Sequence, residues 1–258
     1  MKLSDRCPIC GCSCSVLDVV DFNKSCEEVR GKFLDLCGIP IYYMMCDDCD
    51  FCFAPEMRQW QLKDFAEKVY NAEYEQVDPD YADIRPKANA RFLMSAIKLE
   101  GLSIRHLDYG GGNGTLSSVL REERWNSFSY DPFVDGELSV LSLGKFDFVT
   151  AFEVFEHVPD LKQLMVNLTS LLTPDGMVLF STLLSDNHIR FFERLTWWYA
   201  SPRNGHISLF SAKSLKLLAA QHDLQYFNIS ENLHALCKSK PAWAANLLEL
   251  NSPSAANC

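Results

Sequence analysis

Three alternating glycines follow an acidic residue in the segment from Ile104 to Gly114, IRHLDYGGGNG. The acidic residue is Asp108, and the glycines are Gly110, Gly112 and Gly114. Glycine tolerates positive φ angles and lets the main chain approach a ligand closely, because it has no Cβ. An apolar run precedes the glycines and a helical pattern follows them. This arrangement is typical of a nucleotide-type cofactor site, although ordinary strand-to-helix turns also contain such glycines.

A second acidic residue ends the next β-rich run, Phe128 to Asp131, 23 residues after Asp108. In a doubly wound sheet, a carboxylate at this position hydrogen-bonds the ribose hydroxyls of a bound nucleoside. Phe133 follows two residues later and is a candidate for stacking on the adenine ring. The two acidic residues and the glycines together predict one cofactor site at the edge of a sheet.

Two further segments continue this order: a buried strand that passes into a helix at 146–160, and a helix end, turn and strand at 171–182. Together the motifs resemble those of class I S-adenosylmethionine-dependent methyltransferases, over residues 86–240. The leading Asp and the Gly-x-Gly-x-Gly spacing favour this family over the nicotinamide-dependent enzymes of the same fold. The resemblance implies an α/β fold with a doubly wound, mostly parallel, seven-stranded Rossmann-like sheet. It also implies that S-adenosylmethionine is bound by Asp108, Gly110, Gly112, Gly114, Asp131 and Phe133.

The chain departs from this family pattern between Pro132 and Lys145. That segment is too short for the helix, third strand and loops that usually follow the ribose-binding carboxylate. We therefore expect an abbreviated adenine pocket.

Nine of the eleven cysteines fall within the first 52 residues. Cys7, Cys10, Cys46 and Cys49 form two Cys-x-x-Cys pairs, and a tetrahedral zinc site takes one thiolate pair from each of two turns. The sequence therefore predicts a structural zinc ion at these four residues, with an iron–sulfur cluster as the alternative. Three nearby cysteines could replace a ligand, and two others are expected to be buried thiols; they are Cys12, Cys14 and Cys52, and Cys26 and Cys37, respectively.

Zinc knuckles placed before such a methyltransferase domain resemble the C-methyltransferases that act on nucleotide-linked deoxysugars. The Tyr/Glu/His insertion of those enzymes is not found in this sequence. The segment from Thr196 to Ser211, TWWYASPRNGHISLFS, instead lies where class I methyltransferases commonly build the acceptor pocket. Its aromatic residues could equally belong to the core or to a dimer contact.

Removal of a proton from a hydroxyl or carbon acid needs a base, and histidine is suited to this near neutral pH. His206 is the preferred candidate. The alternative is His157, which shares the motif EVFEH with Glu153 and Glu156. On a helix these three residues would share one face, as a base with its orienting carboxylate, as a divalent-metal site or as stabilisers of the first helical turn.

The 258 residues are 48% apolar and carry a net charge of −10. Such a charge disfavours nucleic acid as a partner. No apolar run approaches the ~18 residues of a membrane span, and no basic-then-apolar leader opens the chain, so we expect no membrane association and a cytoplasmic location.

We expect four parts: a zinc-binding module at 1–55, a connector at 56–85, a methyltransferase domain at 86–240 and a C-terminal tail at 241–258, which is expected to fray from Asn246 onward. The predicted activity is O- or C-methylation of a small polar acceptor, such as a sugar or a precursor of a secondary metabolite or polysaccharide. An RNA or protein methyltransferase that docks through its zinc module, and a non-catalytic protein that retains the fold, are the alternatives.

Overall fold

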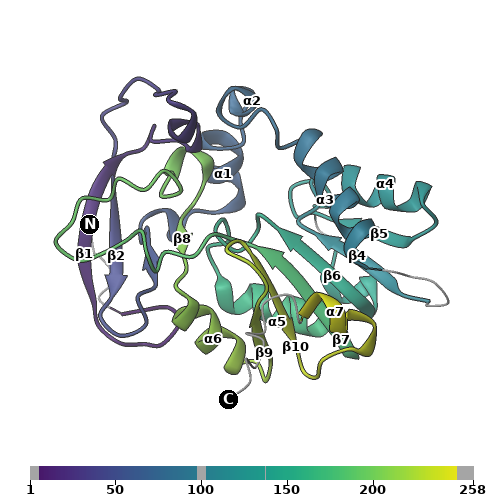
Figure 1. Cartoon of the computed structure of the whole chain (residues 1–258). Helices are drawn as coiled ribbons and strands as arrows, with labels where there is room; N and C mark the ends of the chain where they lie inside the picture. Colours follow the sequence, from purple (N-terminus) through teal and green to yellow (C-terminus); the bar gives the residue numbers. More distant parts are fainter. Residues whose placement is uncertain (1–5, 98–102, 137, 249–258) are drawn as a thin grey trace, which may run out of the picture. The chain divides into compact units, whose positions relative to one another are not determined.

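The computed structural model describes residues 6–97, 103–136 and 138–248, and Figure 1 shows its helices and strands. The chain forms two compact units. Unit 1 contains the residues up to Tyr81 together with Val154–Leu164 and Leu183–Leu218. Unit 2 contains Ala82–Glu153, Met165–Thr182 and the residues from Ala219 onward. The predicted parts are consecutive along the chain, whereas each of the two units combines segments from several parts of the sequence.

Unit 2 is built on a sheet of six strands in the order β5-β4-β6-β7-β10-β9. The four strands β5, β4, β6 and β7 are parallel, and β10 runs antiparallel to both β7 and β9. The predicted doubly wound, mostly parallel sheet is therefore confirmed. The strand bounds are Arg105–Tyr109 for β4, Asn126–Tyr130 for β5, Phe146–Phe152 for β6, Leu172–Ser181 for β7, Gln225–Asn228 for β9 and Leu233–Cys237 for β10.

The predicted number of seven strands is wrong for the described residues, which contain six in this sheet. The difference lies between β5 and β6. This short segment forms only the 3-10 helix η3, Val140–Leu143. An extra parallel strand would need about five residues of its own and a crossover of about a dozen residues or more on each side, whereas only residues 131–145 separate β5 from β6.

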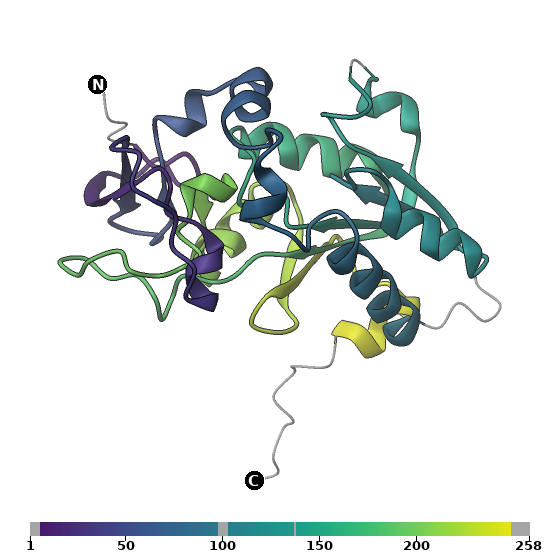
Figure 2. The ribbon, with the colours of Figure 1, turned by 90° about the horizontal axis from the view of Figure 1, so that it is seen from above.

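Helices α3, Ile84–Ala96, and α4, Thr115–Glu122, lie side by side in unit 2, as the view from above in Figure 2 shows. Their buried faces join one hydrophobic cluster with strand residues such as Phe148 and Leu179. Ala90, Leu93 and Ile97 are the buried residues of this cluster at the α3 end of the chain segment. These helices anchor the chain on either side of β4 and the glycine-rich turn.

Part of the predicted fraying tail is ordered. Residues 242–248 form the 3-10 helix η5, Ala242–Ala244, followed by α7, Ala245–Leu248. Leu247 and Leu248 are buried in the cluster that contains α3 residues, which explains why this segment packs. The remaining tail, including Cys258, lies outside the described residues.

Unit 1 contains an antiparallel sheet in the order β1-β2-β3-β8, visible in Figure 1. Three strands come from the cysteine-rich region, and β8 comes from the segment after β7. The bounds are Cys14–Asp21 for β1, Pro40–Cys46 for β2, Cys52–Phe53 for β3 and Ser208–Leu209 for β8. The sequence did not indicate β8, because two residues are too few for an alternating pattern.

Short helices connect the rest of unit 1. They are η1, Cys26–Arg30; η2, Met57–Gln59; α1, Leu62–Lys68; α2, Tyr74–Val77; and η4, Pro202–Asn204. Two longer helices, α5, Leu161–Leu171, and α6, Ala212–Ala220, contain residues of both units. Among the described residues, no helix is long and apolar enough to cross a membrane.

The core of unit 1 combines residues far apart in sequence. Ile41 and Tyr43 of β2 and Phe65 of α1 share one buried cluster with Trp197 and Tyr199. A small core for the cysteine-rich region was expected from residues 1–55 alone. The later segment enlarges that core, so hydrophobic burial also stabilises the cysteine-rich region.

Candidate functional site

The glycine-rich turn of unit 2 connects β4 to α4 at the carboxyl edge of the sheet. Gly110, Gly112 and Gly114 have φ angles of 75°, 54° and 76°. These values lie in the left-handed region, where a Cβ is strongly disfavoured. The backbone N–H groups of Gly110 and Gly111 donate to the carbonyl oxygen of Tyr130, at 2.8 and 3.2 Å. The turn is thereby fixed to the end of β5.

Gly111 requires the absence of a side chain for a different reason. A Cβ there would lie 2.4 Å from Ser129 Oγ and 2.7 Å from Asp108 Oδ2. A Cβ on Gly112 would meet nothing within 4 Å. The turn therefore packs closely on the strand ends below Gly111 and is open at Gly112, as a cradle for a ligand requires.

Asp131 accepts two backbone hydrogen bonds at the end of β5. The N–H of Gly112 donates to its Oδ2 at 2.9 Å, and the N–H of Phe133 donates to its Oδ1 at 2.8 Å. These bonds hold the carboxylate beside the glycine turn, in the position that the sequence predicts for ribose binding. Phe133, the candidate for adenine stacking, is 46% exposed. Its ring is therefore accessible next to Asp131.

Asp108 lies beneath the turn and is 4% exposed. Thr150 Oγ1 on β6 donates a hydrogen bond to Asp108 Oδ1 at 2.7 Å. Burial raises the pKa of Asp108 to about 7, which outweighs the opposite effect of the Thr150 hydrogen bond. The nearby charge of Asp131 contributes in the same direction as burial.

Glu153 follows the end of β6 and belongs to unit 2. Its φ angle is 54°, which is uncommon for a residue with a side chain and is often found at functional sites. Its N–H donates to Ser181 Oγ at 2.8 Å, and Ser181 Oγ donates to Glu153 Oε1 at 3.1 Å. Asp108, Asp131 and Glu153 therefore all stand at the carboxyl ends of parallel strands, the edge where such sheets bind ligands.

The predicted helical face for Glu153, Glu156 and His157 is wrong. This segment forms turns, and α5 begins only at Leu161. The positive φ of Glu153 interrupts the helical geometry directly after β6. Glu153 and His157 are consequently assigned to different units.

His157 and His206 lie together in unit 1, with ring centroids 4.8 Å apart. Their Nδ1 atoms are hydrogen-bonded to backbone carbonyl oxygens, those of Gly205 at 3.2 Å and Tyr199 at 2.7 Å, respectively. Because a carbonyl only accepts, each Nδ1 carries a proton, and Nε2 is the nitrogen of each ring that can offer a lone pair. His206 is 3% exposed, whereas His157 is partly exposed.

Buried Glu156 completes this cluster. Its carboxylate accepts a short hydrogen bond from the hydroxyl of Tyr199. One ligand-type atom from each of Glu156, His157 and His206 lies within 4.8 Å of the others. The structure thus joins His157 to Glu156 and His206, and the sequence did not indicate this grouping.

The aromatic segment before His206 belongs to the core of unit 1. Trp197 and Tyr199 are 7% and 3% exposed. The polar side chains that follow bind the protein itself: Arg203 Nη1 donates to the Val69 carbonyl oxygen at 2.9 Å, and Asn204 Oδ1 accepts from the Cys26 N–H at 2.8 Å. The sequence left an acceptor pocket, the core and a dimer contact open as interpretations of the aromatic residues. The structure supports core packing for Trp197 and Tyr199.

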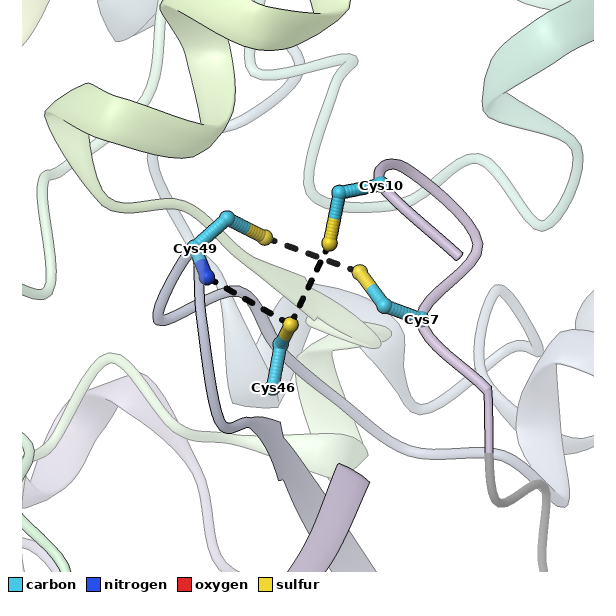
Figure 3. Close-up of side chains that lie close together, drawn as sticks. All are labelled: Cys7, Cys10, Cys46 and Cys49. Carbon is cyan, nitrogen blue, oxygen red and sulfur yellow. Dashed lines mark hydrogen bonds between the residues drawn. The ribbon is translucent and has the colours of Figure 1, made fainter. Parts of the chain in front are cut away.

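The four cysteines predicted to bind zinc point toward one another in Figure 3. The sulfur of Cys7 lies 3.6 Å from that of Cys49, and the sulfur of Cys10 lies 3.4 Å from that of Cys46. All four sulfur atoms lie within 4.8 Å of one another. With Zn–S bonds of about 2.3 Å, the sulfurs of a tetrahedral site are about 3.8 Å apart. The donor set and spacing therefore fit a structural zinc ion.

Backbone N–H groups surround these sulfur atoms. The N–H of Ile9 points to the sulfur of Cys7, and those of Asp48 and Cys49 point to the sulfur of Cys46, each at 3.4 Å. The hydrogen bond with Cys49 lowers the pKa of Cys7 to about 5, despite the opposing effect of burial. The thiolate form that binds metal is therefore favoured at Cys7, whereas burial raises the pKa of Cys46 and the hydrogen bond with Cys7 raises that of Cys49.

The other cysteines differ from expectation in part. Cys12 lies near the cluster, with its sulfur 3.9 Å from Asp48 Oδ2, whereas Cys52 is buried in the core of unit 1. Cys26 is half-buried, but Cys37 is exposed, so its predicted burial is wrong. It lies in the exposed loop between η1 and β2, which its apolar neighbours Phe33 and Leu36 do not cover.

The six-stranded sheet with its glycine turn is the fold of class I S-adenosylmethionine-dependent methyltransferases. A methyltransferase-domain family matches residues 57–229, which is more than half of the chain. The chain belongs to this family.

Individual relatives are more distant. The ubiquinone biosynthesis O-methyltransferase of Colwellia psychrerythraea is 30% identical over 83 residues, which cover 32% of this chain and 34% of that protein. The enzyme of the same name from Azotobacter vinelandii is 30% identical over 91 residues, covering 35% and 39%. The chain thus spans little more than a third of the length of these relatives.

A similar solved structure is that of an O-methyltransferase family protein from Burkholderia thailandensis. It aligns with a TM-score of 0.50 and 13% identity, over 72% of this chain and 67% of that protein. At this identity the likeness concerns the fold alone.

Proposed function

We propose that this protein binds S-adenosylmethionine at the carboxyl edge of the sheet in unit 2 and transfers its methyl group to a small polar acceptor. The observation that carries the proposal is the pairing of the open glycine turn with Asp131. The Asp131 carboxylate is oriented by two backbone N–H groups, and each of its oxygens has further lone pairs for a ribose hydroxyl. When bound, the cofactor would supply an electrophilic methyl group on sulfur.

An oxygen atom is the favoured acceptor. Both matched relatives are named ubiquinone biosynthesis O-methyltransferase. This name describes methylation of an oxygen atom on a small molecule. A hydroxyl acceptor must lose its proton during transfer, so the reaction benefits from a nearby general base. The sugar C-methylation suggested by the zinc knuckles finds no such support among these relatives.

We propose His157 as this base, with His206 as its packing partner and Glu153 as a carboxylate at the sheet edge. His206 was the preferred candidate from sequence, but at 3% exposure it offers little surface to an acceptor. His157 is partly exposed, and its Nδ1–H bond to the Gly205 carbonyl places the basic lone pair on Nε2. The proton of the acceptor would move to that nitrogen.

Zinc is proposed as a structural ion held by Cys7, Cys10, Cys46 and Cys49. Four thiolates close the coordination shell of a tetrahedral site, so such an ion binds no substrate and stabilises the fold. It would fix the start of β1 to the turn between β2 and β3.

A panel of hydroxyl-bearing small molecules tests the proposed activity. Purified protein is mixed with S-adenosylmethionine and each acceptor, and release of S-adenosylhomocysteine is measured by mass spectrometry. We expect release that depends on at least one hydroxylated acceptor and is lost in Asp131→Ala. Methylation of RNA or protein by the wild type, with no small-molecule turnover, would favour a docking role for the zinc-binding region instead.

A further inference from the structure

A chain of four polar side chains crosses three neighbouring strands of unit 2 within the buried sheet. Ser127 Oγ on β5 lies 2.8 Å from His106 Nδ1 on β4, and His106 Nε2 lies 3.0 Å from Thr150 Oγ1 on β6. Thr150 Oγ1 in turn donates to Asp108 Oδ1 at 2.7 Å. His106 and Thr150 are fully buried, and Ser127 is 3% exposed. Buried polar groups need hydrogen-bond partners, and here each side chain finds a partner in the next member of the network.

The strand register explains why these residues meet. His106 and Asp108 are two residues apart on β4 and therefore point to the same face of the sheet. His106 is paired with Ser127 on β5, and Asp108 is paired with Thr150 on β6. The rings of Phe148 and Trp125 pack against His106 and exclude water from it, with centroids at 5.1 and 6.0 Å.

The hydrogen bonds of this network have one direction when Asp108 is ionised. A carboxylate only accepts, so Thr150 uses its single hydroxyl proton on Asp108. The Thr150 oxygen must then accept the proton of His106 Nε2. Burial lowers the pKa of His106 to about 3, which keeps the ring neutral and leaves Nδ1 to accept from Ser127.

The network ends directly below the cofactor turn. Asp108 Oδ2 lies 2.7 Å from the place of a Cβ on Gly111, while Thr150 holds the other oxygen of the same carboxylate. A rotation of the Asp108 carboxylate would therefore change the surface against which the backbone of Gly111 packs. The charged group that faces Asp108 is Asp131, which itself binds the Gly112 N–H.

We propose that His106 is a positioning residue of the cofactor site, which acts through Thr150 to hold the Asp108 carboxylate beneath the glycine turn. The inference rests on the proposed binding of S-adenosylmethionine by that turn. His106 touches neither the turn nor any ligand directly. Its effect is on the orientation of Asp108 and hence on cofactor affinity.

The first test reads the tautomer of His106 without any ligand. In ¹⁵N NMR spectra of the wild-type protein at a pH well above 7, where Asp108 is ionised, we expect the His106 imidazole to carry its proton on Nε2, with Nδ1 unprotonated. A purely space-filling histidine has no such requirement. Observation of the Nδ1–H tautomer or of the doubly protonated ring would overturn the proposed direction of the network.

The second test compares affinities for S-adenosylhomocysteine by calorimetry. Thr150→Val keeps the side-chain shape but removes the hydroxyl, and we expect affinity to fall about 10-fold, the size of one hydrogen bond to a charged group. Thr150→Ser retains the donor and should bind within about 3-fold of the wild type. His106→Leu should lose about as much affinity as Thr150→Val, and His106→Gln, whose amide can donate to Thr150, should recover part of it.

His234 provides a matched control in the same sheet. It is fully buried on β10, and its ring nitrogens bind the Thr182 carbonyl at 2.9 Å and the Tyr226 hydroxyl at 3.0 Å. His234→Leu should lower stability without changing cofactor affinity. If the wild type binds S-adenosylhomocysteine, and Thr150→Val and folded His106→Leu bind it as tightly as the wild type, the positioning role is refuted while the proposed function stands. If the folded wild type does not bind S-adenosylhomocysteine, the proposed function and the positioning role are both refuted.

Discussion

The two units of this protein are organised by different kinds of interaction. Unit 2 has parallel strands such as β6 and β7 whose apolar residues form a continuous buried core. Unit 1 has a short antiparallel sheet, with β3 and β8 of two residues each, and a four-cysteine cluster at one end. Unit 2 is therefore built around a hydrophobic core of its own, whereas unit 1 combines the four-cysteine cluster with a core that is completed by residues from far along the chain.

Loss of the proposed zinc ion should have the largest effect and should be confined to unit 1. Structural zinc sites contribute apparent binding energies of about 10–16 kcal/mol. Cys46→Ser should lose zinc in elemental analysis and lose hydrogen-exchange protection in β1, β2 and β3, while β4 to β7 keep theirs. Cys37→Ser, at an exposed cysteine outside the cluster, is the control and should retain zinc. Iron in place of zinc, or stoichiometric zinc in Cys46→Ser, would contradict the assignment.

Ionisation of Asp108 should destabilise unit 2 in a pH-dependent manner. Burial raises the pKa of this carboxyl to about 7, from 3.8 for an ordinary aspartate. Below about pH 4 the carboxyl is protonated in both the folded and the unfolded state, so its burial does not lower the free energy of unfolding through ionisation. Between about pH 4 and pH 7 the carboxyl ionises in the unfolded state but stays protonated in the folded state, so stability falls over this range, and by about pH 7 up to about 4 kcal/mol is lost.

Asp108→Asn removes this ionisation and isolates its effect. The free energy of unfolding of the variant, minus that of the wild type, should rise between about pH 4 and pH 7 and level off above. Chemical denaturation across this range measures the difference. A difference that does not change with pH would show that Asp108 ionises normally in the folded protein.

Substitution of the two histidines of the unit 1 cluster should have different effects, on turnover for His157 and on stability for His206. We expect His157→Ala to lower turnover about 100-fold, the low end for loss of a general base, with little change in cofactor affinity. Its residual activity should lose the rise with pH that a base confers on the wild type. His206→Ala, which removes a buried ring packed on Tyr199, should mainly lower the thermal midpoint. If His206→Ala abolished turnover in a stable protein while His157→Ala did not, the two roles would be reversed.

Unit 2 could be predicted from sequence to a large extent because its signals are local. The Asp108 to Gly114 motif places a strand, a turn and a helix within a few residues, and the structure has β4, the turn and α4 there. The short segment after Asp131 also indicated that something was missing, and the sheet lacks the expected extra strand. The number of strands was still overestimated, because the family pattern was given more weight than the segment length.

Unit 1 could be predicted only in part, because its contacts are long-range. The Cys-x-x-Cys spacing indicated the residues that the structure brings together. The pairing of Ser208 and Leu209 with β3 could not be predicted, since strand pairing over such distances leaves no local pattern. Similarly, the helical spacing of Glu153, Glu156 and His157 was misleading. Glu153 adopts a left-handed backbone conformation that propensity does not predict.

The hydrogen-bonded pair of His106 and Thr150 beneath the glycine turn could not be predicted from the sequence either. Thr150 carries a weak signal, because it is a polar residue between Val149 and Ala151, whereas His106 stands between Arg105 and Leu107 and carries none. Only the register shows that they meet on one face.

Calorimetric titration of the wild type and Asp131→Ala with S-adenosylhomocysteine tests the central claim most directly. The account predicts saturable binding by the wild type. It also predicts a loss of about 1.5–3 kcal/mol in Asp131→Ala, because hydrogen bonds between ribose hydroxyls and a charged carboxylate are removed. Asp135→Ala provides a check that the effect does not come from the loop alone, since Asp135 accepts the Asp131 N–H at 2.7 Å. Absence of binding by the folded wild type, or equal affinity in Asp131→Ala, would contradict the account.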